Sequence, residues 1–336
     1  MSMKDLPASV VDVIELAVVS EFATVSAAGV PIDTPTYCFA ADDLSLVGVA
    51  TGLAYPAKAE RARRNPKVGL LIEGLPGEPV VSIRGLAAVR DGNFQANALR
   101  YISETGYEDV CAAANVTWDE AKKAVWYWTR IIVDVVPEKV MWWDSAAAMD
   151  SPPHVWAPTE QPRVTSDPAP AGKTSPPSKW PQKKWQEIAQ TAAARGGPAH
   201  VTLMDGDGWP LPIGVRSYKL GGDAFILDVP KGAPWRRSGK ATLTFKGVET
   251  FVGDVSDENG KMRFTIERAL PQHPMVLDPV QVLKPTDDVR TKLLARLEEE
   301  ARRHGQSIPV LPDTPPARTR LSKARFERMG LLGNLT

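Results

Sequence analysis

The sequence predicts a mainly β (α+β) chain built from two small antiparallel barrels with flanking helices. Four or five strand-like segments, mostly joined by hairpins, occupy about 70 residues of the first half. A similar series recurs after residue 182, and a run rich in proline, serine and threonine separates the two series. We therefore expect barrel domains at 1–145 and 182–285, a linker at 146–181, and a helix with a basic tail at 286–336.

The composition limits the classes of function. The chain has 336 residues, enough for two domains, and its 40 basic side chains balance its 40 acidic ones. This balance provides no overall attraction to nucleic acid or to an anionic membrane, so neither is expected as a partner. Two distant cysteines cannot build a disulfide framework. The acidic N-terminal segment does not resemble a secretory signal, and no run of roughly 18 apolar residues occurs, so a cytoplasmic location is expected.

Apolar periodicity predicts the elements of the first half. A helix with one apolar face is expected at Ser9–Val19, followed by strands of period two and then by segments of helical period. Thr117 and Glu120 form a capping-box pattern at the start of the last helix. The expected strands are Phe22–Ser26, Thr34–Phe39, Leu44–Val49, Lys67–Ile72, Val80–Val89 and Ile131–Val136, and the two expected helices after the fifth strand are Asn93–Glu104 and Trp118–Trp128.

The stretch between the third and fourth strands has the features of a phosphate site. Its chain turns at Thr51 and Gly52, continues as a basic helical segment that contains Lys58 and Arg61, and stops at Asn65-Pro66. Turn amides and a helix start offer hydrogen-bond donors, and lysine adds a mobile charge. A solvated basic helix explains the same spacing equally well, with both cations facing the surface.

Three motifs in this order resemble the pyridoxamine 5′-phosphate oxidase-like family, the flavin-binding split β-barrels. They are the strand, turn and basic helix before Asn65-Pro66, the opening strand pair around Gly29-Val30-Pro31, and the late strand Thr129–Trp143. The resemblance covers roughly residues 10 to 145. It implies a split β-barrel fold, a bound flavin mononucleotide (FMN) and oxidoreductase activity.

The resemblance also assigns roles to individual residues. It implies that Lys58 and Arg61 hold the FMN phosphate, that Thr51 donates its hydroxyl in the turn, and that a strand edge lies beside the isoalloxazine ring. That strand edge consists of Pro35, Thr36 and Tyr37. The strand before the turn, Leu44–Val49, carries no basic residue, which departs from the family pattern.

The second half has the pattern of a degenerate copy of the first. Gly208-Trp209-Pro210 aligns with Gly29-Val30-Pro31, and a short turn around Trp235 replaces the basic helix. Because split barrels of this family usually work as homodimers with sites between protomers, the resemblance implies that the two copies form a pseudo-dimer within one chain. Further pairing of chains into a homodimer stays open, and we expect the working site around Lys58.

Three residues of other predicted strands or turns are candidates for a pocket. Arg216, Tyr218 and Trp235 occupy such positions in the second half, and packing in a core or at its rim is an equally good interpretation for each. The four histidines occur singly, without the spacing of a metal site. The tail after Ser307 is proline-rich and then basic, which suits an acidic ligand, a packing role or mobility.

Three classes of function remain open. The first is an FMN-dependent oxidoreductase that acts on a small organic substrate. The second is a cofactor-free lyase or isomerase in which Tyr37, Arg216 or Tyr218 performs acid–base or oxyanion work. The third is a non-catalytic protein that binds flavin, FAD, deazaflavin or haem. The colour of the purified protein separates the first class from the second, and reduction of the bound ligand separates the first from the third.

Overall fold

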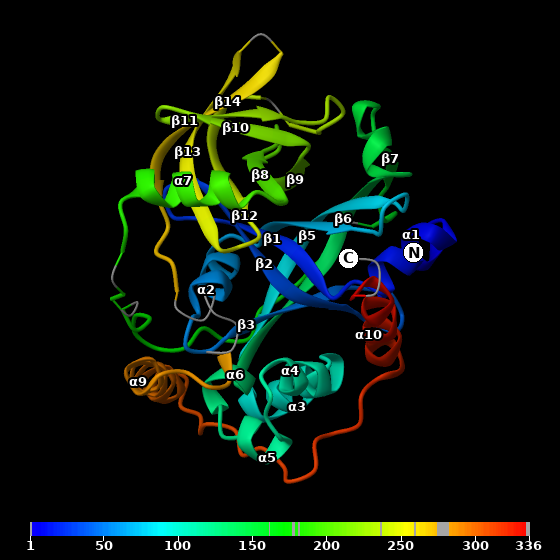
Figure 1. Cartoon of the computed structure of the whole chain (residues 1–336). Helices are drawn as coiled ribbons and strands as arrows, with labels where there is room; N and C mark the ends of the chain where they lie inside the picture. Colours follow the sequence, from blue (N-terminus) through cyan, green and yellow to red (C-terminus); the bar gives the residue numbers. More distant parts are fainter. Residues whose placement is uncertain are drawn as a thin grey trace.

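The computed structural model describes residues 2–160, 162–176, 179–180, 182–235, 237–258, 260–273 and 282–333. It contains two antiparallel sheets, stacked one above the other in Figure 1. The strands of the first sheet are β1 (Val19–Val25), β2 (Pro31–Ala40), β3 (Val47–Gly52), β4 (Lys67–Glu73), β5 (Val80–Arg90), β6 (Arg130–Trp143) and β7 (His154–Trp156). The second sheet comprises β8 (Ala199–Met204), β9 (Pro210–Val215), β10 (Ser217–Gly221), β11 (Ala224–Asp228), β12 (Gly239–Phe245), β13 (Glu249–Glu258) and β14 (Lys261–Ala269).

The first sheet closes into a six-stranded barrel. Its order is β3-β2-β1-β4-β5-β6, and an additional pairing of β3 with β6 completes the ring. The long strand β6 pairs with β5 along its length and shifts register between Arg84 and Gly85, where Pro137 lies opposite. A proline is tolerated there because a bulge already interrupts the ladder. Closure of the ring pairs both edges of the six-stranded sheet with each other. The short strand β7 adds to the sheet by pairing with the last part of β6.

The second sheet repeats this ring with one interruption. Strands β9 and β10 correspond to the two ends of β2: β9 pairs with β8 as β2 pairs with β1, and β10 pairs with β11 as β2 pairs with β3. Arg216 separates them, and its backbone N–H donates to the carbonyl of Asp228 at 2.9 Å. The predicted two-barrel fold of the chain is therefore confirmed.

The two barrels pack against each other about a pseudo-twofold axis. Strand β4 packs on β9 while the equivalent pair, β12 and β2, also packs together. Counting from the aligned prolines Pro31 and Pro210 makes Glu21 and His200 equivalent, and their side chains meet at 3.2 Å. His200 also contacts the carboxylate of Glu73 at 3.0 Å. An equivalent pair in contact marks the seam of an intrachain pseudo-dimer.

Burial and neighbouring carboxylates together set the charge states along this seam. Burial opposes a charge on His200, but hydrogen bonds and charges from Glu21 and Glu73 outweigh it and raise the pKa of the imidazole to about 10. Burial and the neighbouring charge of Glu21 raise the pKa of Asp33, which is fully buried, well above its usual range. The seam is therefore held by an imidazolium between carboxylates.

Helices cover the barrel ends and sides. A helical insertion between β5 and β6 lies at the end of the first barrel away from the second sheet (Figure 1). The helices are α1 (Ala8–Glu15), α2 (Ala57–Arg64), α3 (Phe94–Glu104), α4 (Tyr107–Ala113), α5 (Trp118–Ala121), α6 (Val125–Trp128), α7 (Trp185–Arg195), α9 (Asp287–Arg303) and α10 (Arg320–Gly333), with short 3-10 helices η1 (Met3–Asp5) and η2 (Ala146–Asp150). Among the residues that the structure describes, no helix combines the length and apolar character needed to cross a bilayer.

Two predicted helices differ from the observed ones. The segment Trp118–Trp128 forms two short helices, α5 and α6. Between them the carbonyl of Ala121 accepts from the backbone N–H of Ala124 at 2.9 Å and from the indole N–H of Trp128 at 2.8 Å. Helix α1 stops at Glu15, whose carbonyl accepts from the Nε of Arg325 at 2.8 Å. The basic tail thus packs on the first barrel through α10.

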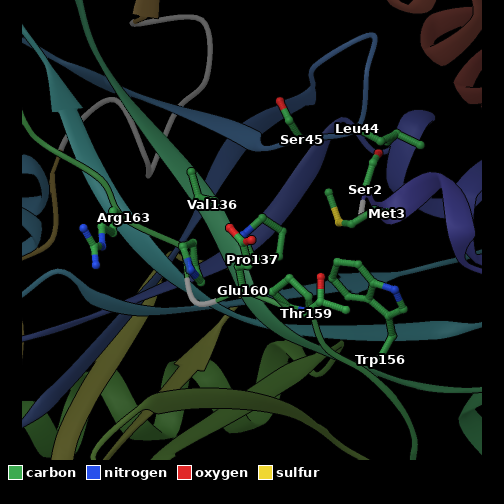
Figure 2. Close-up of a pocket in the computed structure, with 12 residues that line it drawn as sticks. Ser2, Met3, Leu44, Ser45, Val136, Pro137, Trp156, Thr159, Glu160 and Arg163 are labelled. Atoms are coloured by element: carbon green, nitrogen blue, oxygen red, sulfur yellow. The ribbon is translucent and has the colours of Figure 1, made fainter.

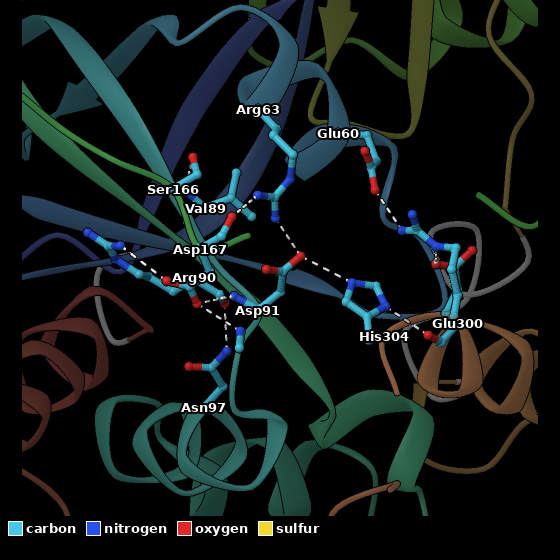
Figure 3. A network of polar contacts seen from close by, with 12 residues as sticks. Glu60, Arg63, Val89, Arg90, Asp91, Asn97, Ser166, Asp167, Glu300 and His304 are labelled. Atoms are coloured by element: carbon cyan, nitrogen blue, oxygen red, sulfur yellow. Dashed lines mark hydrogen bonds and ion pairs between the residues drawn. The ribbon is translucent and has the colours of Figure 1, made fainter. Parts of the chain in front are cut away.

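The linker is anchored to the first barrel by a polar network (Figure 3). Asp167 accepts from the backbone N–H groups of Asp91 and Gly92 at 3.0 and 2.7 Å. Asp91 in turn forms an ion pair with Arg63 of α2 at 2.6 Å and a hydrogen bond with the Nε2 of His304, just after α9, at 3.1 Å. These contacts join α2, the linker and the C-terminal region at one place.

Candidate functional site

A cavity of about 670 Å³ lies between the two halves of the chain. Its first wall comes from β2, β3 and the start of α2, its second from the helical insertion α3–α6, and its third from the turn between β12 and β13 together with residues 270–273. This volume falls within the range of small-molecule and cofactor pockets. The seam of the pseudo-dimer therefore provides a site to which both halves contribute.

The described lining of this cavity contains cations but no carboxylate. Its cations are Lys58 on α2, Arg130 at the start of β6, and Lys246 in the turn after β12. None of the three forms an ion pair with a carboxylate of the described residues. An acid-free cavity with three cations favours an anionic ligand.

Lys58 projects from the first turn of α2 into the cavity. Its Nζ donates to the Oγ1 of Thr36 at 3.1 Å. Burial, together with the nearby charges of Arg61 and Arg130, lowers the pKa of the Lys58 ammonium to about 8. A bound anion would relieve both effects, because it would supply the missing opposite charge.

Arg130 is held between aromatic rings. Its guanidinium carbon lies 4.3 Å from the ring centre of Tyr101 and 4.4 Å from that of Tyr127. The Nε of Arg130 is buried and has no hydrogen-bond partner among the described residues. Strand register places Arg130 opposite Gly52, where a Cβ would lie 3.4 Å from a guanidinium nitrogen. The turn at Gly52 therefore lies directly beside this cation.

Tyrosines form the aromatic wall of the cavity. The ring of Tyr37 packs edge-on against Tyr101, with centroids 6.0 Å apart. The hydroxyl of Tyr101 donates to that of Tyr127 at 3.2 Å. Burial raises the pKa of Tyr37 above its ordinary value, so its phenol stays protonated at neutral pH. The wall thus combines flat apolar faces with neutral hydroxyl groups.

A tyrosine–histidine pair closes another side of the cavity. The hydroxyl of Tyr55 and the Nε2 of His273 are hydrogen-bonded, and their rings pack edge-on. Burial, and then the nearby Arg296, lower the pKa of His273 to about 4. The imidazole is therefore neutral at pH 7, and burial also raises the pKa of the Tyr55 phenol, so the pair is a hydrogen bond between two neutral groups.

Five of the residues that the sequence predicted lie together around this cavity. They are Pro35, Thr36, Tyr37, Thr51 and Lys58. Their roles in binding a ligand stay predictions.

The other four predicted residues lie outside the cavity lining. Arg61 faces β1, where its Nε donates to the Oγ1 of Thr24 at 2.7 Å, so the expectation that both cations of α2 face the surface is not met. Trp235 is buried in the second barrel and donates to the carbonyl of Leu211 at 2.9 Å. Arg216 pairs with Asp150 at 2.9 Å, and the hydroxyl of Tyr218 donates to the carbonyl of Gly197 at 3.1 Å.

Sequence reasoning missed several residues of the cavity. Arg130, Tyr101 and Tyr127 belong to the insertion or its end, and Lys246 and His273 come from the other half of the chain. For Arg130 a signal existed, because closing the barrel by pairing the third strand with the last places its first residues beside the turn at Gly52. For His273 the sequence offers no periodic signal.

A larger hollow of about 1170 Å³ lies at another end of the first barrel (Figure 2). It is bordered by Ser2 and Met3, by the β2–β3 hairpin, by the bulge of β6, and by the linker from Trp156 to Arg163. Glu160 and Arg163 are its charged residues among those described, and one is acidic. The hollow shares neither the aromatic wall nor the acid-free lining of the first cavity.

No family model and no curated protein matches the chain. Solved structures do resemble it. General stress protein 26 from Bacillus anthracis is 16% identical, with 47% of this chain and 99% of that chain covered and a TM-score of 0.30. A pyridoxamine 5′-phosphate oxidase-related, FMN-binding protein from Nostoc punctiforme is 10% identical, with 42% and 86% covered and a TM-score of 0.31. A protein related to general stress protein 26, of the pyridoxinephosphate oxidase family, from Clostridium acetobutylicum is 12% identical, with 47% and 96% covered and a TM-score of 0.31.

The strand pairings decide the fold. The chain carries two split β-barrels in tandem. Each of these solved structures covers less than half of this chain. The likenesses concern the fold and carry no argument about chemistry.

The equivalent position in the second split barrel is filled by the chain itself. Arg216 is the counterpart of Tyr37, and Lys231 is the counterpart of Gly52. The carboxylate of Asp150 in η2 contacts both, at 2.9 Å from the Arg216 side chain and 2.9 Å from the Lys231 backbone N–H. The backbone N–H of Gly232 also donates to the carbonyl of Met149 at 2.9 Å. Among the described residues of the two equivalent positions, the one at Lys58 lines a cavity and the other is occupied by η2.

Proposed function

We propose that this chain binds a flavin-type cofactor, FMN or a deazaflavin, in the cavity at Lys58 and uses it to oxidise or reduce a small organic substrate. The observation that carries the proposal is the acid-free cavity between the barrels, in which Lys58 has a lowered pKa and no carboxylate partner among the described residues. The cavity volume of about 670 Å³ suits a cofactor of this size.

The residues present fit a planar anion with a phosphate. Lys58 supplies a mobile charge for the phosphate, and the hydroxyls of Thr36 and Thr51 lie in the same lining. Pro35 and Tyr37 offer flat surfaces for a ring system. Gly247 approaches Pro35 so closely that a Cβ would lie 2.3 Å from its Cγ, so the second half bounds the same space.

When bound, the flavin supplies the two-electron chemistry. The protein supplies binding and orientation. Tyr55 and neutral His273 share a hydrogen bond at the cavity wall, where these two neutral groups can hydrogen-bond a ligand. Residues 270–273 and the turn at Gly247 cover one side of the cavity and reduce its contact with water.

The experiment is a titration of the purified chain with FMN and with riboflavin, which lacks the phosphate. We expect FMN to bind with quenched fluorescence, and riboflavin to bind more weakly. Bound FMN, once photoreduced without oxygen, should be reoxidised by an organic acceptor faster than free FMN in the same buffer. A chain that releases no flavin on boiling and leaves the fluorescence of added FMN unchanged would refute the proposal.

A further inference from the structure

We propose that Arg130 and the three tyrosines around it, Tyr37, Tyr101 and Tyr127, form a subsite for the carboxylate of an aromatic substrate. This inference rests on the proposed function, since it divides the same cavity into a cofactor position at Lys58 and a substrate position at Arg130. It names the substrate class as small aromatic carboxylates.

Arg130 is held in place before any ligand arrives. Its guanidinium lies between the rings of Tyr101 and Tyr127, at 4.3 and 4.4 Å from their centres. The hydroxyl bond between the two tyrosines, and the ring of Trp128 packed against both, hold the rings in place. Binding a ligand to a side chain that is already ordered costs little conformational entropy.

Arg130 has no carboxylate partner among the described residues, whereas several other arginines inside the fold do. Arg84, Arg63 and Arg325 each pair with a carboxylate at 2.6 to 2.9 Å. Arg130 forms no ion pair within the described part of the chain, and its Nε is buried without a hydrogen bond. A guanidinium N–H that is buried without an acceptor raises the free energy of the folded chain. A bound anion would accept the hydrogen bond that this N–H lacks and would balance the charge of the guanidinium.

The geometry of the guanidinium and the form of the cavity wall both suit an aromatic carboxylate. A guanidinium presents parallel N–H groups that match the two oxygens of a carboxylate, whereas a lysine ammonium is a point charge suited to a phosphate. The wall beside Arg130 continues into the small side chains of Ala113 and Ala114 on and just after α4. Flat tyrosine faces next to small residues leave space for an aromatic ring that extends from the carboxylate.

This part of the cavity is specific to the first barrel. Tyr101 and Tyr127 belong to the helical insertion between β5 and β6. In the second barrel the equivalent strands, β13 and β14, are joined by a tight hairpin, with Glu258 paired to Lys261. The insertion therefore adds a substrate wall to the open site and not to the filled one.

The test measures binding of benzoate and of its neutral isostere benzamide to the FMN-loaded chain. The variants are Arg130→Met and Arg130→Lys. The matched control is Arg100→Met, because Arg100 also lies over a ring, that of Phe39 at 4.9 Å, but is paired with Asp134 outside the cavity lining.

We expect Arg130→Met to weaken benzoate binding about tenfold to a hundredfold, as loss of a charged hydrogen-bonded pair implies. Benzamide binding should change less than about twofold, since it lacks the charge that this arginine recognises. Arg130→Lys should be intermediate because lysine cannot form the two parallel bonds. The FMN affinity of every variant should equal that of the unsubstituted chain. The benzoate affinity of Arg100→Met should also be unchanged.

Three results would overturn the inference. Wild-type chain that binds benzoate no better than benzamide, or phenyl phosphate better than benzoate, would remove the carboxylate assignment. Loss of FMN in Arg130→Met with benzoate binding retained would move Arg130 to the cofactor phosphate and leave the proposed function intact. If the unsubstituted chain binds no FMN, the proposed function fails. The subsite is then tested on the FMN-free chain by comparing the benzoate affinity of the unsubstituted chain with that of Arg130→Met.

Discussion

The lowered pKa of Lys58 makes the affinity for a phosphate-bearing ligand depend on pH. In the free protein the ammonium has a pKa of about 8, because it is buried near Arg61 and Arg130 without a carboxylate partner among the described residues. A bound phosphate would supply that partner and return the pKa toward its ordinary value of 10.5. Binding should therefore take up a proton wherever the free lysine is neutral.

The size of the effect follows from the two pKa values. At pH 7 about nine-tenths of the free protein carries a charged Lys58, and at pH 9 only about one-tenth does. The complex stays charged at both values. The affinity for FMN should thus fall about tenfold between pH 7 and pH 9, which equals about 1.4 kcal/mol of binding free energy.

Fluorescence titrations at several pH values measure this effect directly. Riboflavin is the matched ligand, because it lacks the phosphate and should show no such dependence over this range. Lys58→Met should bind FMN more weakly at pH 7 and lose the tenfold dependence, while its riboflavin affinity stays near that of the unsubstituted chain. An FMN affinity of Lys58→Met that follows the wild-type pH profile would place the phosphate elsewhere and refute the reasoning.

Two further predictions concern the seam between the barrels. The pKa of His200 is raised to about 10 in the folded chain, so its contribution to stability is complete below about pH 6.5 and is lost as the pH rises toward 10. Between pH 6.5 and 9 the thermal midpoint of the wild type should fall more than that of His200→Gln, and parallel curves would contradict this. Gly247→Ala adds a Cβ 2.3 Å from the Cγ of Pro35 at a positive φ of 70°, so it should destabilise the fold by about 1–3 kcal/mol and weaken FMN binding in chemical denaturation and titration experiments. Gly206→Ala, where nothing lies within 4 Å, is the control and should leave both quantities nearly unchanged.

The sequence contains enough information for the strands and for half of the site. Apolar alternation and turn residues locate the barrel strands, because each face of a strand meets either the core or another layer. The turn at Thr51 and the basic start of α2 are local features, so Lys58 was found from them. The site residues on β2, Pro35, Thr36 and Tyr37, are implied by the family resemblance.

The remaining site residues depend on long-range packing. Lys246 and His273 reach the cavity only because the second barrel docks on the first about the pseudo-twofold axis. Trp235 and Arg216 are candidates for a pocket from the sequence because they occupy predicted strand or turn positions. They instead pack in the second barrel or pair with η2, a segment whose docking no local pattern indicates.

The stoichiometry of FMN binding tests the central claim most directly. The account holds that two barrels in one chain form a pseudo-dimer with one open site at Lys58, because η2 occupies the equivalent position through Asp150. Equilibrium titration monitored by calorimetry should give one FMN per chain. Two per chain, or no saturable binding at all, would contradict it.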